Sequence, residues 1–325
     1  MMLPIDEITA PIKGDLELFE TKLKEFLIAE NPLIYQITHH IFSTTGKRLR
    51  PATLFLSAGA LGYEGEDVVT PAIAIELIHT ATLLHDDVID ESHHRRGKET
   101  VNHKWTNLAA VLSGDYFFAK AFKLLVRAGR HDLLEAVSLA TERVSIGELG
   151  QIQELNNTSL SEADYINIIT DKTAALFSCA GECGAKLAGA NGKESQSIRN
   201  FGEELGIAFQ IADDLLDYIG DEEKLGKSIG SDLKEGWFTL PLIYSLANSS
   251  DAVSREIKSI LNNGFREEQF SKICDFVHES GGIDYTRNIA ITFQEKALRW
   301  LEEIAESEYK NALSKLADYS IAREK

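Results

Sequence analysis

Residues 73–90 read IAIELIHTATLLHDDVID, a long apolar run that ends in an aspartate triplet. Residues 205–217 read LGIAFQIADDLLD and have the same form. The aspartates are Asp86, Asp87 and Asp90 in the first run and Asp213, Asp214 and Asp217 in the second. In a helix the first and last members of each triplet project from one face and could chelate one hard cation. If folding makes the two runs face each other, we expect six carboxylates around one cavity.

The alternative is that both triplets are solvated helix ends. Like-charge pairs at this spacing cost only about 0.2–0.5 kcal/mol each in an exposed helix, so repulsion does not exclude it. The preceding residues argue against it, because both runs have the composition of core helices, where an unneutralised carboxylate is expensive. Two matching triplets therefore indicate a functional site.

The rest of the chain predicts an all-α protein. Apolar residues recur at helical spacing over five further stretches, residues 16–28, 54–61, 133–155, 166–187 and 293–316. Pro51 and Pro71 fit helix starts, and no series of alternating strands or low-complexity linker is apparent. With 325 residues, 44% of them hydrophobic, the chain can bury a large core. We expect one domain over residues 1–325, a bundle of ten or more helices around a central cavity.

Charge and composition limit the possible partners. A net charge of −18 argues against nucleic acid or an anionic membrane as a general electrostatic partner. Residues 1–7 are acidic and lack the basic-then-apolar order of a secretory signal, so a cytoplasmic protein is expected. Glu76 and His79 interrupt the best candidate for a membrane-spanning run, so we expect no transmembrane segment and at most peripheral membrane contact.

The three cysteines do not suggest a disulfide framework, because their number is odd. Cys179 and Cys183 lie one helical turn apart and could contribute to a soft-metal site, but no histidine cluster accompanies them. We interpret them as small buried helix residues.

The other residues that could bind a ligand are basic. The basic segments are Gly46-Lys47-Arg48-Leu49-Arg50-Pro51, Arg95-Arg96-Gly97, Lys172-Thr173 and Gly226-Lys227-Ser228. Each alone is better interpreted as solvated charge. Next to two carboxylate triplets they suggest diphosphates that are bridged by metal and held by cations.

Together with His79, Gly147-Glu148-Leu149 and Phe209-Gln210, these motifs make the chain resemble the all-trans isoprenyl diphosphate synthase family over about residues 40–245. Within that family it is similar to the long-chain, octaprenyl-diphosphate-synthase-like branch. The resemblance implies the isoprenoid synthase fold, a homodimer and a Mg²⁺-dependent prenyltransferase. Such an enzyme condenses isopentenyl diphosphate with an allylic diphosphate (1′-4, trans) to a long-chain polyprenyl diphosphate and releases diphosphate.

The resemblance also implies residue roles. Magnesium would be held by Asp86, Asp90 and Asp213, with Asp87, Asp214 and Asp217 in or near the shell. The allylic diphosphate would be held by Arg95, Lys172, Thr173, Gln210 and Lys227. With the three principal aspartates, Lys172 and Lys227 would form the catalytic set. Isopentenyl diphosphate would be held by Lys47, Arg50, His79 and Arg96, with Arg48 nearby.

Three polar residues of expected helices, His79, Glu148 and Gln151, could be either structural or functional. A lone histidine on an apolar helix is usually a satisfied core residue, but His79 lies seven residues before Asp86, and two helical turns nearly restore the same face. We therefore favour contact with ligand. Glu148 and Gln151 could be a polar helix-packing pair or line the cavity, and both interpretations stay open.

Trp237 departs from the family pattern, which usually has a lysine here that reaches the allylic diphosphate. The indole either replaces a dispensable cation or packs against the protein. We favour packing, because Trp237 and Phe238 form an aromatic pair beside a helix expected to begin near Leu240.

Product length is predicted from the residues before the first triplet. Ala81 and Thr82 are small and lie five and four residues before Asp86, so they should flank an open path beneath the reacting carbon. In the family an aromatic residue at this position stops the growth of the prenyl product early. Since Ala81 and Thr82 are small, products well beyond farnesyl are expected.

Three alternatives remain. A shorter-chain synthase of farnesyl or geranylgeranyl diphosphate would use the same motifs. A non-catalytic subunit of a heteromeric synthase is suggested only by Trp237. A terpene cyclase would also use aspartates and magnesium, but it would leave Lys47 and Arg50 with no second diphosphate to bind.

Overall fold

Helices make up almost all of the secondary structure in the computed structural model, which describes residues 4–28, 31–43, 46–95, 97–219, 230–262 and 267–322. The helices are α1 (Ile5–Ile8), α2 (Lys13–Phe26), α3 (Pro32–Phe42), α4 (Leu49–Ala60), α5 (Val69–Ile89), α6 (Val101–Lys104), α7 (Asn107–Ala128), α8 (His131–Gln153), α9 (Glu162–Ile169), α10 (Ala175–Leu187), α11 (Gly192–Ile219), α13 (Ser231–Glu235), α14 (Leu240–Asn248), α15 (Asp251–Asn262), α16 (Phe270–Glu279), α17 (Gly282–Leu301) and α18 (Glu308–Ile321). Short turns are η1 (Ala10–Ile12), η2 (Glu66–Val68), η3 (Thr170–Ala174) and η4 (Glu267–Gln269). The strands of the described residues, β1 (His94–Arg95) and β2 (Lys98–Glu99), form one hairpin. The all-α prediction is confirmed.

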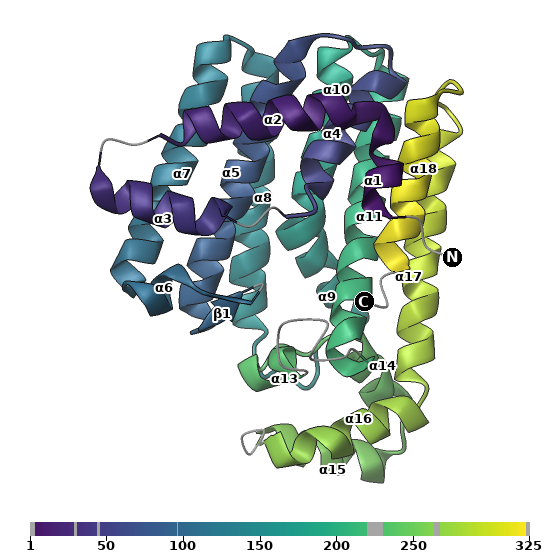
Figure 1. Cartoon of the computed structure of the whole chain (residues 1–325). Helices are drawn as coiled ribbons and strands as arrows, with labels where there is room; N and C mark the ends of the chain where they lie inside the picture. Colours follow the sequence, from purple (N-terminus) through teal and green to yellow (C-terminus); the bar gives the residue numbers. More distant parts are fainter. Residues whose placement is uncertain are drawn as a thin grey trace.

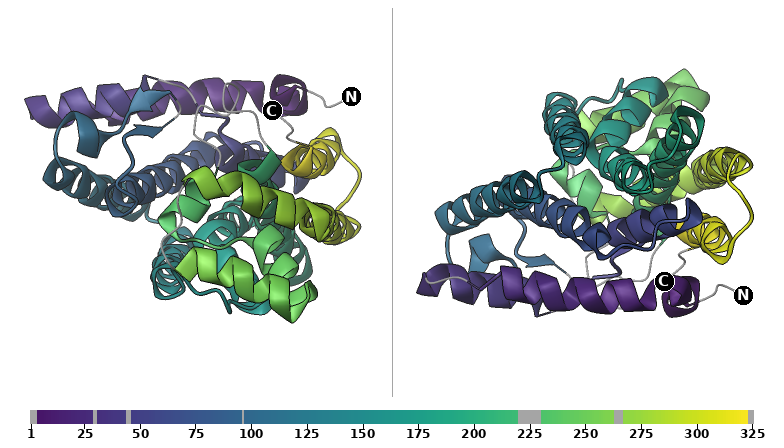
Figure 2. Two further views of the ribbon diagram at one scale, coloured as in Figure 1. Left: turned by 90° about the horizontal axis from the view of Figure 1, so that it is seen from below. Right: turned by 90° about the horizontal axis from the view of Figure 1, so that it is seen from above.

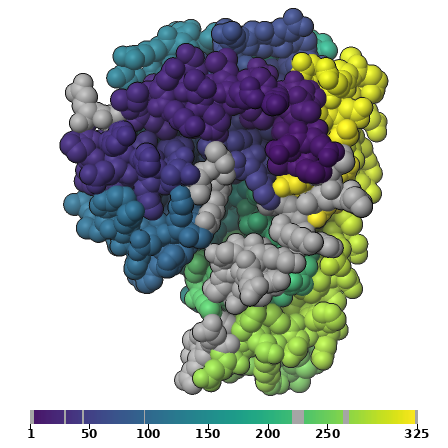
Figure 3. Space-filling model, viewed as in Figure 1, coloured from purple at the N-terminus to yellow at the C-terminus, as the bar shows by residue number. Residues whose placement is uncertain are grey.

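The long helices run roughly up and down the view of Figure 1, while α2 and α3 lie across them. Seen from below and from above, α2 and α3 form an outer layer on one side of the bundle (Figure 2). In the space-filling view they cover the upper front of the molecule (Figure 3). Toward the C-terminus, α17 packs along α11, and α18 packs against α4 and α17.

Helix α5 is largely buried in the core. Ala74, Ile75, Leu77, Ile78 and Ala81 have no exposed surface. Of the described residues, only Glu66–Ile89 is long and apolar enough to cross a membrane, and 72% of its most apolar window is buried inside the protein. The apolar sequence is therefore accounted for by packing in the helical core.

Local sequence signals set several helix ends. Pro51 and Pro71 lie in the first turns of α4 and α5, where a missing N–H costs no helical hydrogen bond. Ser307 begins α18, its hydroxyl accepting a hydrogen bond from the Lys310 N–H at 3.1 Å. The periodic stretch 293–316 is thus parts of two helices, because a short non-helical segment ending in the N-cap Ser307 separates α17 from α18.

The stretch 166–187 is also interrupted. Between α9 and α10 the turn η3 is a π-helix, in which each hydrogen bond spans one more residue than in an α-helix. Apolar periodicity cannot distinguish this insertion from a continuous helix. The cysteines Cys179 and Cys183 of α10 are buried and free, as their interpretation as small core residues requires.

Candidate active site

Both aspartate triplets lie at the C-terminal ends of long helices, α5 and α11, and folding brings these ends together. A cavity of about 1140 Å³ is lined by residues of both triplets, of β1 and of α13. A neighbouring cavity of about 590 Å³ is lined by the start of α4 and the middle of α5. The residues common to both are Asp86, Arg95, Lys172, Thr173, Gln210 and Asp213. The two cavities therefore share a wall built from the predicted diphosphate site.

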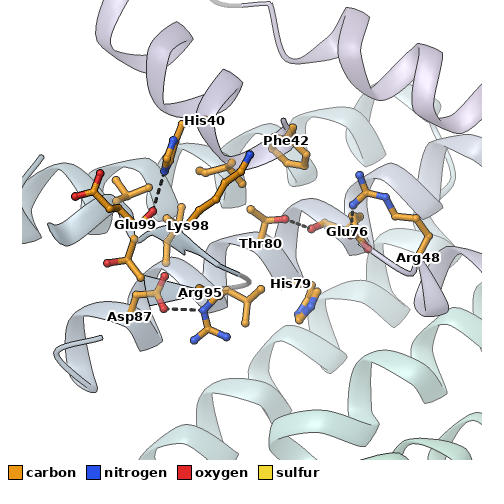
Figure 4. A pocket seen from close by; sticks show the side chains of 15 residues that line it. His40, Phe42, Arg48, Glu76, His79, Thr80, Asp87, Arg95, Lys98 and Glu99 are labelled. Carbon is orange, nitrogen blue, oxygen red and sulfur yellow. Dashed lines mark hydrogen bonds and ion pairs between the residues drawn. The ribbon is translucent and has the colours of Figure 1, made fainter. Parts of the chain in front are cut away.

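Four of the six aspartates line the larger cavity, namely Asp86, Asp90, Asp213 and Asp214. Asp87 is turned toward Arg95, whose Nε donates to its Oδ1 at 2.7 Å (Figure 4). Asp217 is 1% exposed and accepts hydrogen bonds from the N–H and hydroxyl of Ser231, at 3.2 and 2.9 Å, at the start of α13. Of the six carboxylates expected around one cavity, four therefore line it, while Asp87 and Asp217 are not among its lining residues. Their assignment to the metal shell stays a prediction.

The carboxylates of the first triplet are partly withdrawn from water. Burial raises the pKa of Asp87, against the opposing effect of Arg95. Burial also raises the pKa of Asp90, against the effect of Lys172. Both groups would therefore gain from an additional positive charge in the cavity.

Lys172 lies in the π-turn and is paired with Glu148 of α8, with Nζ and Oε2 2.7 Å apart. The pKa of Glu148 is raised to about 7, because burial and the nearby Asp86 raise it by more than Lys172 lowers it. Burial works against the charge of Lys172, but Asp86 and Glu148 raise its pKa. Glu148 lines the smaller cavity and Gln151 the larger one. Of the two interpretations of these residues, a polar helix-packing pair or cavity lining, the structure therefore supports cavity lining.

The approach of α8 to the π-turn depends on Gly147. A Cβ atom at Gly147 would overlap the backbone nitrogen and Cα of Lys172. Only glycine lets the two backbones come this close. The motif residue Gly147 therefore acts by placing Lys172 and Thr173 at the cavity.

A chain of hydrogen bonds, partly buried at Thr173 and Gln210 and buried at Tyr165, connects the π-turn to the second triplet. The hydroxyl of Thr173 donates to Gln210 Oε1 at 2.8 Å, and Gln210 Nε2 donates to Asp214 Oδ1 at 2.6 Å. The other carboxylate oxygen of Asp214 accepts from the Tyr165 hydroxyl at 2.6 Å. Tyr165 is not predictable from the sequence, because nothing in its local pattern distinguishes it from a core tyrosine.

Trp237 packs behind this chain. Its side chain is 5% exposed, and its ring stacks on Tyr165 with 6.1 Å between centroids and 27° between planes. Part of it lines the larger cavity. The structure agrees with the packing interpretation, since the indole supports the tyrosine that holds Asp214.

The predicted clamp for isopentenyl diphosphate lines the smaller cavity through Lys47, Arg50 and His79. Lys47 Nζ lies 5.2 Å from the centroid of the Tyr319 ring of α18, and Arg50 Cζ lies 4.6 Å from that of Phe177 of α10. Both cations are thus held against aromatic faces. Arg96 and Lys227, predicted for the two diphosphates, lie outside the described residues.

Arg48 differs from its neighbours. Its guanidinium is directed to Glu76. Both residues line a third cavity, of about 100 Å³, which is the one shown in Figure 4. Glu76 is the single charged residue within 73–84, and a buried acid in an apolar run is a signal that it has a cationic partner.

The two chain-length positions are separated by the fold. Thr82 lines the smaller cavity, but Ala81 is 0% exposed in the core and lines neither of the two site cavities. Consecutive helix residues point about 100° apart, and on α5 this rotation directs Thr82 to the cavity and Ala81 into the core. The lining of the cavity supports the expectation for Thr82, and a role of Ala81 in product length stays a prediction.

The carboxylates suit a hard cation. Among the described residues no three His, Cys, Asp or Glu side chains are close enough to hold a metal as they stand. However, four carboxylates from two helices line one cavity, and carboxylate oxygen is the ligand that Mg²⁺ prefers. The donor type fits magnesium.

Comparison with known proteins gives a consistent result. The family model described as polyprenyl synthetase matches residues 31–277. Octaprenyl diphosphate synthase of Escherichia coli (strain K12) is 37% identical over 321 residues, covering 99% of this chain and 98% of that protein. Geranylgeranyl diphosphate synthase of Sulfolobus acidocaldarius is 34% identical over 313 residues, covering 93% and 94%. The crystal structure of a polyprenyl synthase from Caulobacter crescentus CB15, complexed with calcium and isoprenyl diphosphate, superposes with a TM-score of 0.95 at 34% identity, covering 99% of this chain and 98% of that one.

Proposed function

Because the chain belongs to the polyprenyl synthetase family and is a trans-prenyltransferase, we propose that it condenses isopentenyl diphosphate with an allylic diphosphate to form a long-chain polyprenyl diphosphate. The main support for this proposal is the arrangement of the two cavities. The carboxylates of both triplets and the cations Lys47 and Arg50 line adjoining cavities that share Lys172 and Arg95. Two diphosphates could therefore be bound side by side, one through metal and one through cations.

The allylic diphosphate would occupy the larger cavity. Asp86, Asp90 and Asp213 would hold Mg²⁺, with Asp87, Asp214 and Asp217 in or near the shell. Bound magnesium would stabilise the negative charge that builds on the leaving diphosphate as its carbon–oxygen bond breaks. Arg95, Lys172, Thr173, Gln210 and Lys227 would bind the same diphosphate oxygens, as charged and hydrogen-bonding groups do.

Isopentenyl diphosphate would lie in the smaller cavity, held by Lys47, Arg50, His79 and Arg96. Its double bond forms the new carbon–carbon bond to the first carbon of the allylic substrate, and diphosphate leaves. A proton is then lost from the condensed product to the departing diphosphate, which restores a double bond. The apolar Leu83, Leu176 and Phe209 of the cavity wall would keep water from the cationic centre.

A long-chain product is supported by the small side chain of Thr82 on the cavity wall. The alternative is a farnesyl or geranylgeranyl diphosphate synthase, which is favoured by the similarity to the enzyme from Sulfolobus acidocaldarius. A non-catalytic subunit has less support, because four aspartates line the cavity and Trp237 packs without displacing them.

We also propose that the protein is a homodimer. Helices α7 and α8 contact each other and carry large exposed apolar side chains, including Leu108 (69% exposed), Leu112 (57%), Ile146 (54%) and Leu149 (62%). An accumulation of such residues on a globular protein is typical of an interface. The cytoplasmic location expected from composition stays a prediction.

Labelled isopentenyl diphosphate tests the proposed activity. The purified chain with Mg²⁺ and geranyl, farnesyl or geranylgeranyl diphosphate as primer should incorporate the label into products longer than geranylgeranyl diphosphate. Products that end at geranylgeranyl length would support the short-chain alternative. Absence of any incorporation by the purified chain would overturn the assignment as a self-sufficient synthase.

A further inference from the structure

Arg48 lies between two residues of the isopentenyl diphosphate clamp, but its own charge is directed into the protein. Its Nε donates to Glu20 Oε1 of α2 at 2.7 Å, and its Nη1 donates to Glu76 Oε1 of α5 at 2.5 Å. The side chains of Arg48 and Glu76 are each 10% exposed, and that of Glu20 is 26% exposed. The guanidinium also lies 5.6 Å from the Phe19 ring centroid. One cation thus connects α2, α4 and α5.

The backbone at Arg48 is strained in a way that requires such support. Its φ of 51° and ψ of 38° fall in the left-handed region, which residues with a Cβ seldom occupy. Strained conformations of this kind persist where surrounding contacts over-determine them. The Arg48 carbonyl accepts the Ala52 N–H at 2.9 Å, so the same residue also begins α4.

These contacts determine where the clamp lies. Lys47 immediately precedes the strained residue, and Arg50 follows it in the first turn of α4. If Arg48 changed its backbone conformation, both clamp cations would move relative to the cavity. Lys47 and Arg50 can direct their charges to a ligand in the cavity. The charge of Arg48 is instead balanced by the carboxylates of Glu20 and Glu76.

We infer that Arg48, through its ion pairs with Glu20 and Glu76, is a positioning residue that sets the isopentenyl diphosphate clamp without binding the diphosphate itself. This inference rests on the proposed function. It also gives α2 a role at the site: Glu20 and Phe19 lie outside residues 31–277, the part of the chain that matches the family model.

The competing explanation is that Arg48 is itself a diphosphate ligand. It lines the smaller cavity, and its Nη2 has no hydrogen-bond partner within the part of the chain that the structure describes. The two explanations predict opposite effects of removing a carboxylate partner. If Arg48 is a positioning residue, loss of the Glu20 carboxylate leaves it less well held and weakens the binding of isopentenyl diphosphate. If Arg48 is itself a ligand, the same loss frees its guanidinium to bind the diphosphate more tightly.

The test compares Glu20→Gln, Arg48→Lys and the control Glu17→Gln. Glu17 lies on the same helix as Glu20, and its exposed carboxylate forms a long surface ion pair with Lys13, at 3.9 Å. Steady-state kinetics would be measured for both substrates with the full-length protein and Mg²⁺. Binding of isopentenyl diphosphate without metal would be measured by calorimetry, which does not depend on turnover.

Both Glu20→Gln and Arg48→Lys should raise KM and Kd for isopentenyl diphosphate about tenfold, equivalent to about 1.4 kcal/mol. The allylic KM and kcat should change less than twofold, and Glu17→Gln should match the unaltered protein. Tighter binding in Glu20→Gln would overturn the inference in favour of a direct ligand. Unchanged constants in Glu20→Gln would overturn it as well, and this variant decides the question if Arg48→Lys does not fold.

Failure of the proposed function would look different. In that case the unaltered protein would neither bind isopentenyl diphosphate nor incorporate it. An unaltered protein that binds it, next to a Glu20→Gln variant that binds it equally well, would overturn only the role of Arg48.

Discussion

At the scale of single residues, buried and half-buried charges at this site have protein partners that hold them in place. Asp87 is paired with Arg95, Lys172 with Glu148, and Arg48 with Glu20 and Glu76. Breaking a buried pair by removing one member leaves an uncompensated charge, which costs about 3–5 kcal/mol. Substitutions at the site must therefore be tested for folding as well as for activity.

The aspartates that line the cavity give the first prediction. Asp86→Ala or Asp213→Ala should lower Mg²⁺-dependent turnover roughly a hundredfold or more, the effect of losing one transition-state contact. Both variants should fold, as measured by circular dichroism. Asp284→Ala, an exposed aspartate of α17, is the control and should keep full activity. Near-normal turnover of a folded Asp86→Ala variant at saturating magnesium would contradict the metal assignment.

Trp237 gives the second prediction. Trp237→Lys should lower the melting temperature and depress activity with every substrate, because it buries an amine and removes the ring that stacks on Tyr165. Loss of a buried aromatic ring costs about 3–5 kcal/mol. Trp300→Lys, at a position that is 36% exposed, is the matched control and should melt near the unaltered protein. A tighter allylic KM at an unchanged melting temperature would instead show that lysine restores a missing cation.

The third prediction concerns product length. Thr82→Phe places a ring on the wall of the smaller cavity and should shift products toward farnesyl or geranylgeranyl length, as judged by chromatography of labelled products. Ala81→Phe places the same ring in the core and should lower the melting temperature, since overpacking costs about 1–3 kcal/mol. If Thr82→Phe leaves the product distribution unchanged, the chain grows along another path.

At the scale of the elements, both triplets lie where a helix least favours negative charge. The helix macrodipole carries about half a negative charge at the C-terminus, and α5 and α11 end at Ile89 and Ile219 with no basic residue in the last turn. Each helix end therefore adds to the repulsion among its carboxylates. A bound cation would relieve both effects, which gives a physical reason for the pairing of these two ends.

The approach of α8 to the π-turn gives the fourth prediction. Gly147→Ala should displace Lys172 and Thr173, lower kcat and destabilise the protein by about 1–3 kcal/mol, because the added methyl overlaps backbone atoms. Gly150→Ala on the same helix is the control, since its methyl would meet only the side chain of Ile168. Kinetics and thermal melts of the two variants measure the difference. Equal behaviour would mean that the π-turn adjusts without cost.

At the scale of the whole molecule, the proposed dimer gives the fifth prediction. Leu112→Asp on α7 should shift the protein toward monomer in analytical ultracentrifugation, because a charge in an apolar interface is strongly unfavourable. Val253→Asp, which also changes an exposed apolar residue (40%) but on α15, should leave the assembly unchanged. A monomeric unaltered protein would contradict the proposed dimer.

The predictions that the sequence supported by itself were those that depend on local spacing. Apolar periodicity predicted the all-α fold, and the repeated triplets with their basic segments predicted the family, which the matched model and relatives confirm. Both depend on residues a few positions apart, where helix geometry alone relates spacing to direction. His79 was placed toward the cavity for the same reason.

Only the tertiary structure decided what each side chain contacts. It separated Asp86 from Asp87 and Thr82 from Ala81, neighbours in sequence that helix rotation directs to different surroundings. Only the structure shows the π-turn at Lys172. It also shows the contacts of Arg48 with Glu20, 28 residues away, and of Tyr165 with Asp214, 49 residues away. Such contacts depend on how helices rotate and approach one another in a packed core, which the pattern of any one segment does not encode.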